Sequence, residues 1–289
     1  MKKIGFFSCL VLISLSAYSF ILYKKTTVYS INKIEKNWGK VKNNLFASKF
    51  ETTNKEYQLF LRSIQSTSTP EKFESLRVQV ENWNPPGKNT MKPLVDNYYQ
   101  HPSYENYPLV NVSHAGAVAY CQWLSTVYNN RPKRKYKKVK FRLPTEAEWI
   151  AAARGGHQEA PFPWGGYYTR NGNGEFLANF MRIPDTSIKR NFKTGEIEIK
   201  DDVINNFKAD LNDAYAFPAP VLEYHANNFG LYNMSGNVAE MLAETGQTKG
   251  GSWASTGYYI RIDAEDEYAG ITKPDPRIGF RYFVEIIEE

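Results

Sequence analysis

The stretch "NNFGLYNMSGNVAEM", residues 227–241, combines recurring Asn and Gly with a single carboxylate and shows no helical or strand periodicity. The same irregularity begins after Gly156, and residues 181–220 are rich in Gly, Asn, Asp and Pro. Such a long irregular region is unusual in a compact domain. The two cysteines, Cys9 and Cys121, leave no disulfide within the body to hold it together. A bound metal ion is therefore the natural candidate for that role.

The first half of the chain carries the signals of ordinary helices. A capping residue followed by apolar residues at helical spacing predicts the start of each helix. These starts are at Thr53, at Thr69, at Ser113 after a short strand that ends at Val112, and at Thr145. The helix after Ser113 buries an apolar stripe that includes Cys121, which we interpret as a core thiol. The helix after Thr145 ends at Gly155.

Residues 1–23 stand apart from the rest of the chain. Lysines flank an apolar run, residues 4–23, that is about long enough to cross a bilayer as an anchor. The run also fits a bacterial secretory signal that is cut after Ser19. Both alternatives imply export, so we predict a periplasmic or cell-surface protein, and we favour a retained membrane anchor over cleavage. Residues 24–44 are predicted to form a polar tether and residues 45–287 to form one domain.

The segment "RPKRKYKKVKFR", residues 131–142, contains eight basic residues. We interpret it as a solvated loop and strand that lead into the next helix. Contact with anionic lipid headgroups is the functional alternative if the N-terminal anchor is retained. The net charge of +6 does not by itself indicate a partner. A nucleic acid is not expected to be a partner of an exported protein.

Seven motifs occur in order along about residues 45–285, and together they resemble the formylglycine-generating enzyme, or sulfatase-modifying factor, family. They are "FETTNKEYQLFL", "YPLVNVSHAGAVAYCQWL", "RLPTEAEWIAAARGG", "FPWGG", "NNFGLYNMSGNVAEM", "KGGSW" and "GFR". The resemblance implies a single loop-rich α+β domain with little regular secondary structure, distantly similar to C-type lectin folds. It also implies structural calcium at one or two sites.

The calcium ligands that the resemblance implies are oxygen atoms, which calcium prefers. One site would use the side chains of Asn233 and Glu240 and the backbone carbonyls of Gly236 and Val238. The other site would use Asn179, the Phe180 carbonyl, Asp213 and the Tyr215 carbonyl. The alternative for each site is an Asx-turn or a buried carboxylate with backbone partners.

Family enzymes that make formylglycine hold Cu(I) with two cysteine thiolates, a soft ligand type that suits this ion. The matching positions in this chain are Ser255 and Ile260. A hydroxyl is a poor ligand for Cu(I), and an isoleucine side chain offers no ligand at all. Cys121 lies in a predicted helix and cannot substitute. We therefore expect no copper and no formylglycine-generating oxidase activity.

Three functions remain open. The first is a non-catalytic, calcium-stabilised module that binds a protein or glycan in the bacterial cell envelope, for example within a gliding or secretion-type assembly. Its cleft would have a polar, acidic and aromatic lining: Ser252, Trp253, Tyr258, Tyr259, Asp263, Glu265 and Asp266. The second is a metal-dependent oxidoreductase that uses the carboxylates of this cleft as ligands, and the third is a structural spacer beneath a larger envelope complex. The alternative for the acidic run itself is a solvated loop.

Overall fold

The computed structural model describes residues 31–83, 92–181, 186–190, 194–195, 197–201 and 217–289. The predicted signal or anchor, residues 1–23, and two predicted calcium ligands, Asp213 and Tyr215, lie outside the described residues. The chain divides into two compact units, Met1–Lys36 and Asn37–Glu289. The described part of the first unit is helix α2, Ile31–Lys36. Within the described ranges, no helix combines the length and the apolar character that crossing a bilayer requires.

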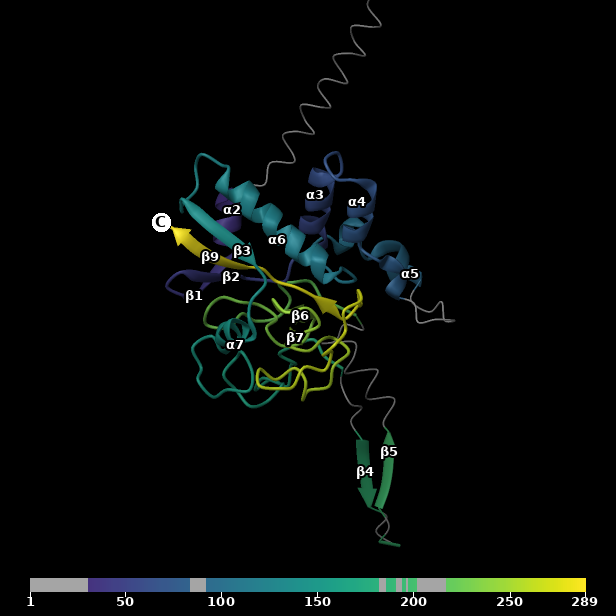
Figure 1. Cartoon of the computed structure of the whole chain (residues 1–289). Helices are drawn as coiled ribbons and strands as arrows, with labels where there is room; N and C mark the ends of the chain where they lie inside the picture. Colours follow the sequence, from purple (N-terminus) through teal and green to yellow (C-terminus); the bar gives the residue numbers. More distant parts are fainter. Residues whose placement is uncertain (1–30, 84–91, 182–185, 191–193, 196, 202–216) are drawn as a thin grey trace, which may run out of the picture. The chain divides into compact units, whose positions relative to one another are not determined.

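A four-stranded antiparallel sheet joins the beginning and the end of the unit Asn37–Glu289 (Figure 1). In spatial order its strands are β1 (Trp38–Lys42), β2 (Leu45–Ser48), β9 (Phe283–Glu288) and β3 (Lys138–Arg142). Phe283 on the central strand β9 pairs with Ala47 on one side and with Arg142 on the other. The strand predicted within the basic segment is thus confirmed as β3.

The body begins earlier than the sequence predicted. Strand β1 falls inside the predicted tether, residues 24–44, and the compact unit starts at Asn37 instead of residue 45. The reason is the aromatic ring of Trp38, which packs against the rings of Tyr128 and Phe141 at centroid distances of 5.6 and 5.8 Å. Burial of this large ring holds β1 against the sheet despite the polar residues around it.

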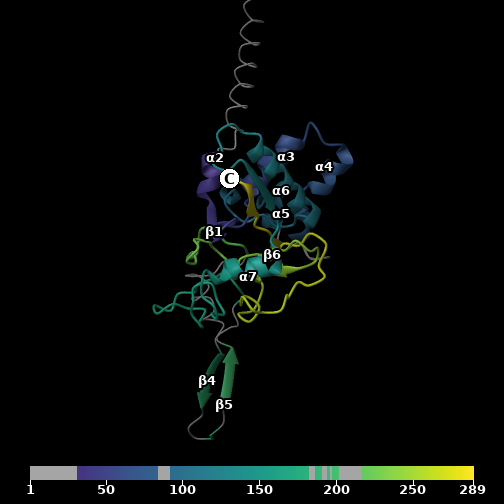
Figure 2. The same ribbon diagram turned by 60° about the vertical axis from the view of Figure 1, so that its left-hand side comes forward.

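The helices and the irregular segments occupy different halves of the body. Both views place α3 to α6 in one half and α7 with β6 in the other (Figures 1 and 2). The helices of the first half are α3 (Asn54–Ile64), α4 (Pro70–Leu76), α5 (Lys92–Asn97) and α6 (His114–Asn129), with 3₁₀ turns η1 (Val80–Trp83) and η2 (Pro102–Tyr104). Helix α6 packs on β3, and its buried stripe includes Cys121 as predicted. Burial raises the pKa of this thiol, which is a core side chain.

Local capping signals set the helix starts, and both capping boxes are present. In α3 the carboxylate of Glu56 accepts a hydrogen bond from the Thr53 backbone N–H at 2.9 Å, and the Thr53 hydroxyl caps the helix in return. Thr145 and Glu148 make the same exchange at the start of α7, Glu146–Arg154. Helix α7 ends at Gly155, whose φ of 55° is left-handed, as predicted.

The short strand predicted to end at Val112 does not form. Residues 107–112 are irregular apart from an isolated bridge between Thr53 and Pro108. Their backbone groups bond to loops instead, since Leu109 N–H donates to the Thr52 carbonyl and Gln79 N–H donates to the Asn111 carbonyl. A strand needs a neighbouring strand to pair with, and this segment has loops on both sides.

Two smaller β structures complete the described fold. Strand β6 (Ala239–Met241) pairs antiparallel with β7 (Thr248–Lys249) and parallel with β8 (Ile278–Gly279). Strands β4 (Thr186–Arg190) and β5 (Ile197–Asp201) form an antiparallel hairpin within residues 181–220, where the sequence showed no periodicity. The sheets of the described residues are all open.

One core cluster ties the four-stranded sheet to the irregular half. Trp149 of α7 is fully buried in it together with Ala47 of β2, Phe283 of β9 and Leu231 from the loop before β6. The ring of Trp149 therefore fixes α7 against the sheet. Its indole N–H points to a carboxylate on β6, which leads to the polar network described next.

Candidate functional site

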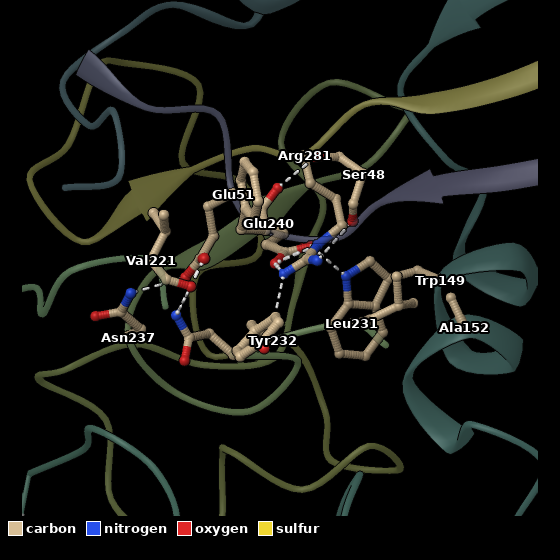
Figure 3. A network of polar contacts seen from close by, with 12 residues as sticks. Ser48, Glu51, Trp149, Ala152, Val221, Leu231, Tyr232, Asn237, Glu240 and Arg281 are labelled. Atoms are coloured by element: carbon tan, nitrogen blue, oxygen red, sulfur yellow. Dashed lines mark hydrogen bonds and ion pairs between the residues drawn. The ribbon is translucent and has the colours of Figure 1, made fainter. Parts of the chain in front are cut away.

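A buried ion pair joins Arg281, which precedes β9, to Glu240 on β6 (Figure 3). The side chains of Arg281 and Glu240 are 0% and 1% exposed. The Arg281 Nε lies 2.8 Å from each Glu240 carboxylate oxygen, and Nη2 lies 2.6 Å from Oε1. The Trp149 indole N–H donates to Oε2 at 2.7 Å, and the remaining guanidinium groups donate to the carbonyls of Ser48 and Tyr232. Both buried charges are thereby paired and hydrogen-bonded, as burial requires.

Close backbone approach at Gly279 allows this pair to form. A Cβ atom at Gly279 would lie 2.5 Å from the carbonyl oxygen of Leu109, so only glycine fits there. The parallel pairing of β6 with β8 places Glu240 opposite Gly279, two residues before Arg281. In the "GFR" motif, Gly279 therefore allows the close backbone packing and Arg281 supplies the charge that pairs with Glu240.

Glu51 is a second buried carboxylate beside this pair (Figure 3). Its oxygens accept hydrogen bonds from the side-chain amides of Asn237 at 2.7 Å and Asn233 at 3.1 Å. Burial raises the pKa of Glu51 to about 7, although the nearby charge of Arg281 acts to lower it. Glu51 was not among the residues predicted from the sequence. The available signal was an acidic residue two positions before the capping residue Thr53.

Left-handed backbone conformations within residues 227–241 bring the two predicted calcium regions together. Asn233, Gly236 and Asn237 have φ values of 52°, 73° and 63°. A Cβ at Gly236 would lie 2.2 Å from the carbonyl oxygen of Asn179, and Asn237 N–H donates to that oxygen at 2.7 Å. Asn179 and the loop 233–237 are therefore in direct contact, although they are far apart in the sequence.

Two buried amide oxygens in this region have no hydrogen-bond partner. They are Oδ1 of Asn233 and Oδ1 of Asn179. The amide nitrogens of both residues are used, since Asn233 donates to Glu51 and to the Val221 carbonyl, and Asn179 donates to the Phe217 carbonyl. A buried acceptor without a partner is costly, and a cation bound to it would remove that cost. These two oxygens fit the role of calcium ligands.

Glu240 does not fit the role of a calcium ligand in this arrangement. Its two oxygens already accept four short contacts, three from Arg281 and one from Trp149. A carboxylate offers about four lone-pair positions, so calcium would have to displace one of these donors. The positive charge that the resemblance assigned to calcium beside Glu240 is supplied here by Arg281. Gly236 and Val238 lie in the irregular loop that leads directly into β6.

The position that resembles the first copper cysteine, Ser255, lies in a buried cluster of hydroxyl groups. The Tyr268 Oη lies 2.8 Å from Ser255 Oγ and 2.6 Å from Ser252 Oγ. The Ser255 hydroxyl also accepts a hydrogen bond from the Ser252 backbone N–H at 2.8 Å. Burial raises the pKa of Tyr268, although hydrogen bonds from the two serines act to lower it. The three hydroxyls thus satisfy one another and present no soft ligand.

The position that resembles the second copper cysteine, Ile260, packs in an apolar cluster. Ile260 is fully buried against Phe162, Ala178 and Phe180. Its backbone carbonyl accepts a hydrogen bond from Ser235 at 2.6 Å. The predicted ligand Phe180 thus contributes its ring to this cluster.

The aromatic residues of the predicted cleft do not pack on one common surface. Trp253 stacks on Trp83 at a centroid distance of 6.3 Å, and the rings of Tyr258 and Tyr259 meet edge to face at 5.2 Å.

The three acidic residues of the predicted cleft do not converge either. Asp263 pairs with Arg261, Asp266 accepts hydrogen bonds from the backbone and hydroxyl of Thr248, and Glu265 is exposed. Among the described residues, no group of three or more His, Cys, Asp or Glu side chains has an arrangement that could hold a metal ion. Only Ser252 among the cleft residues joins the Ser255–Tyr268 cluster.

The chain is similar to curated proteins with and without the family's activity. It is 34% identical over 139 residues to a "Formylglycine-generating enzyme" of Thermomonospora curvata, which covers 48% of this chain and 34% of that protein. It is 28% identical over 234 residues to an "Inactive C-alpha-formylglycine-generating enzyme 2" of Mus musculus, which covers 72% of this chain and 63% of that protein. The chain thus spans between about a third and two thirds of the length of these relatives.

The fold has a counterpart among solved structures. The structure of PvdO from Pseudomonas aeruginosa superposes with a TM-score of 0.52 at 19% identity, over 83% of this chain and 80% of that one. This likeness confirms the predicted loop-rich α+β fold. The model of the "Sulfatase-modifying factor enzyme 1-like domain" matches residues 35–286, so the chain belongs to the sulfatase-modifying factor, or formylglycine-generating enzyme-like, family.

Proposed function

We propose that this chain is a non-catalytic member of its family, tethered to the bacterial membrane outside the cytoplasm, where it binds a partner in the cell envelope. The observation that carries the proposal is the chemistry of Ser255 and Ile260. One contributes a hydroxyl that is committed to Tyr268, and the other is an apolar side chain in a packed cluster. Similarity to proteins named inactive in mouse and cattle supports the same conclusion.

The loss of two thiolates matters because Cu(I) is a soft ion. It is held by thiolate or thioether sulfur far better than by hydroxyl oxygen. Cys121, the one cysteine of the described residues, is buried within α6 and its thiol pKa is raised, which disfavours the thiolate. The chain therefore has no thiolate pair to place where the family's copper would be.

The binding surface that we propose consists of exposed tyrosines on two neighbouring loops. Tyr167, Tyr168 and Tyr258 are 72%, 80% and 55% exposed. The loops that carry them adjoin, because a Cβ at Gly257 would lie 3.9 Å from the Thr169 side chain. Tyrosine offers a large apolar face and a hydroxyl at little entropic cost, which suits a protein or glycan partner.

Calcium is proposed as a structural ion of this module. The unpartnered oxygens of Asn233 and Asn179 support at least one oxygen-rich site in the irregular half. When bound, calcium would supply the cross-link that disulfides supply in other loop-rich exported domains. Binding at these asparagines requires no change at the Arg281–Glu240 pair.

Restoring cysteines at positions 255 and 260 tests whether the chain lacks oxidase function. We would measure Cu(I) retention and conversion of a cysteine-containing peptide to formylglycine with the full chain and with a Ser255→Cys/Ile260→Cys variant. The wild type is expected to retain no stoichiometric Cu(I) and to leave the peptide unchanged. The double variant, with two thiols restored, serves as the positive control for copper binding, and Ser255→Ala/Ile260→Val serves as the control for disturbance of the core.

Turnover by the wild-type chain would contradict the proposal, and so would a redox metal that stays bound in stoichiometric amount. The binding role has its own test. Crosslinking in intact envelopes should capture a partner with the wild type and with Leu222→Ala, a substitution at another exposed apolar residue. A Tyr167→Ala/Tyr168→Ala/Tyr258→Ala variant should lose that partner. Equal capture by both variants would exclude the tyrosine surface.

A further inference from the structure

The described body carries a cluster of exposed lysines on one loop. Lys133, Lys135 and Lys137 are exposed in the segment between α6 and β3, and Lys138, the first residue of β3, is exposed as well. Lys133 and Lys138 make no ion pair with a described carboxylate, and Lys137 meets Glu288 only at 3.5 Å in a largely exposed pair. Lys133 and Lys138 therefore carry positive charge that no described carboxylate pairs with.

Two carboxylates of β9 lie near this loop. Glu285 is engaged by Arg142, whose guanidinium also binds Glu148. Glu288 pairs across the strands with Lys138 in register, and its carboxylate reaches Lys137. Glu288 thus lies next to two lysines at this end of the sheet.

Aromatic packing holds the loop in a defined conformation. The Tyr136 ring stacks on Trp38 at 6.4 Å with an interplanar angle of 18°, and it lies 6.1 Å from Phe46. The Lys135 ammonium lies over the Tyr136 ring at 5.0 Å. Arg134 donates to the carbonyl oxygens of Lys137 and Arg131, which closes the turn. The turn that carries the lysines therefore has a defined backbone conformation.

The loop lies where the chain enters the body. Trp38, on which Tyr136 stacks, is the second residue of the unit Asn37–Glu289 and opens β1. Lys40 of β1 is exposed and pairs with Phe46, whose ring contacts Tyr136. We call Lys40, Lys133, Lys135, Lys137 and Lys138 the basic entry surface.

We propose that the basic entry surface binds the anionic phospholipid headgroups of the membrane to which the chain is tethered. The inference rests on the proposed tether. Residues 24–37 separate the apolar run from Trp38, and 14 residues of chain cannot span more than about 50 Å, which limits how far the surface can move from the anchor. Lysine clusters next to a membrane segment are attracted to anionic lipid within a Debye length. Headgroup contact would set the orientation in which the tyrosine surface meets its partner.

The test uses the full chain reconstituted in two kinds of vesicle. One kind is phosphatidylcholine alone, and the other contains about one third phosphatidylglycerol. Amine labelling followed by mass spectrometry reports the accessibility of each lysine. The five lysines of the basic entry surface are expected to label roughly three-fold or more slowly on the anionic vesicles, and this protection should vanish in about 1 M salt. Lys72, exposed on α4, should label equally on both.

Charge reversal provides the matched comparison. Lys133→Glu/Lys135→Glu/Lys138→Glu should abolish the protection of Lys40 and Lys137 on anionic vesicles. Lys72→Glu/Lys92→Glu/Lys273→Glu changes the net charge equally at other exposed positions and should leave it intact. Equal labelling of the wild type on both vesicles would overturn the inference, and so would equal behaviour of the two variants. Circular dichroism spectra of both variants would be compared with the wild-type spectrum to check that the variants are folded.

Failure of the tether is distinguishable from failure of the surface. If the chain leaves phosphatidylcholine vesicles in high salt, the proposed anchor is wrong. Lipid binding by the basic entry surface is then measured by co-flotation of the chain with vesicles at low salt. Salt-sensitive flotation with phosphatidylglycerol vesicles, lost on reversal of Lys133, Lys135 and Lys138, would still support lipid binding, and no flotation would overturn it.

Discussion

Arg281 and Glu240 form a fully buried ion pair in which the guanidinium makes three contacts of 2.6 to 2.8 Å with the carboxylate. Through Ser48, Tyr232 and Trp149 the same pair reaches β2, the loop before β6, and helix α7. Segments from both halves of the body therefore meet at one charge pair. This arrangement makes the pair a sensitive point for stability.

Replacement of Arg281 by Gln is expected to lower the free energy of unfolding by about 3–5 kcal/mol, because it leaves a buried carboxylate without its counter-charge. Chemical denaturation followed by circular dichroism measures the change. Arg261→Gln is the control, since it breaks a solvent-exposed pair with Asp263 and should leave the stability nearly unchanged. A loss at Arg281 no larger than at Arg261 would show that the pair is not structural.

Replacement of Gly250 by Ala is expected to destabilise the chain by about 1–3 kcal/mol. Gly250 has a φ of 93°, and a Cβ there would lie 3.0 Å from Trp149 Cζ2. The control is Gly174→Ala, where φ is 86° but nothing lies within 4 Å of the added atom. The difference between their unfolding free energies isolates the contact with Trp149. Equal costs would mean that backbone strain alone explains the glycine.

Replacement of Tyr268 by Phe is expected to cost about 1–2 kcal/mol, since two buried serine hydroxyls lose a partner. Thermal unfolding measures the effect. Tyr258→Phe removes a hydroxyl from a side chain that is 55% exposed and should change stability by less than about 0.5 kcal/mol. An unchanged melting temperature for Tyr268→Phe would argue against the hydroxyl cluster around Ser255.

Acid should weaken the fold partly through Glu148. Hydrogen bonds from Arg142 lower the pKa of Glu148 to about 2, from an ordinary value of 4.5. A carboxyl whose pKa is depressed in the folded state contributes stability above the unfolded pKa and loses it as the pH falls through the folded pKa. The contribution is therefore present above about pH 4.5 and disappears towards pH 2.

Glu148→Gln should remove this part of the pH dependence. We expect a loss of about 1–2 kcal/mol at pH 7, discounted because the pair is partly open to solvent, and a flatter stability curve between pH 4.5 and 2. Denaturant titrations at several pH values measure it. Glu146→Gln, in the same first turn but largely exposed, is the control. Parallel curves for the wild type and Glu148→Gln would refute the assignment.

Calcium should stabilise the chain through the unpartnered asparagine oxygens. At a concentration 100 times the dissociation constant, a single bound ion adds about 2.7 kcal/mol, so a chelator should lower the melting temperature by several degrees. Asn233→Ala and Asn179→Ala should each reduce that sensitivity. Asn227→Ala should destabilise the chain and keep its calcium response, because the Asn227 amide bonds to the carbonyls of Ala152 and Ala153. An unchanged wild-type melting temperature in chelator would reject the calcium proposal.

Local features of this fold were predictable because their interactions are short in sequence. Thr53 and Glu56, or Thr145 and Glu148, are three residues apart, so a capping box can be recognised from the residues alone. The left-handed Gly155 is equally local. By contrast, the strand β1 depends on Trp38 packing against distant rings, which the polar residues around Trp38 do not reveal.

The candidate site shows the same division. The sequence alone determined that the side chains at positions 255 and 260 offer no sulfur ligand, because the identity of Ser255 and Ile260 excludes one whatever the packing. Only the tertiary structure decided which groups meet. Arg281 reaches Glu240 across 41 positions, and Asn237 reaches Glu51 across 186. Such partners are selected by burial, since a charge removed from water must find an opposite charge or a donor among whatever side chains the fold brings near.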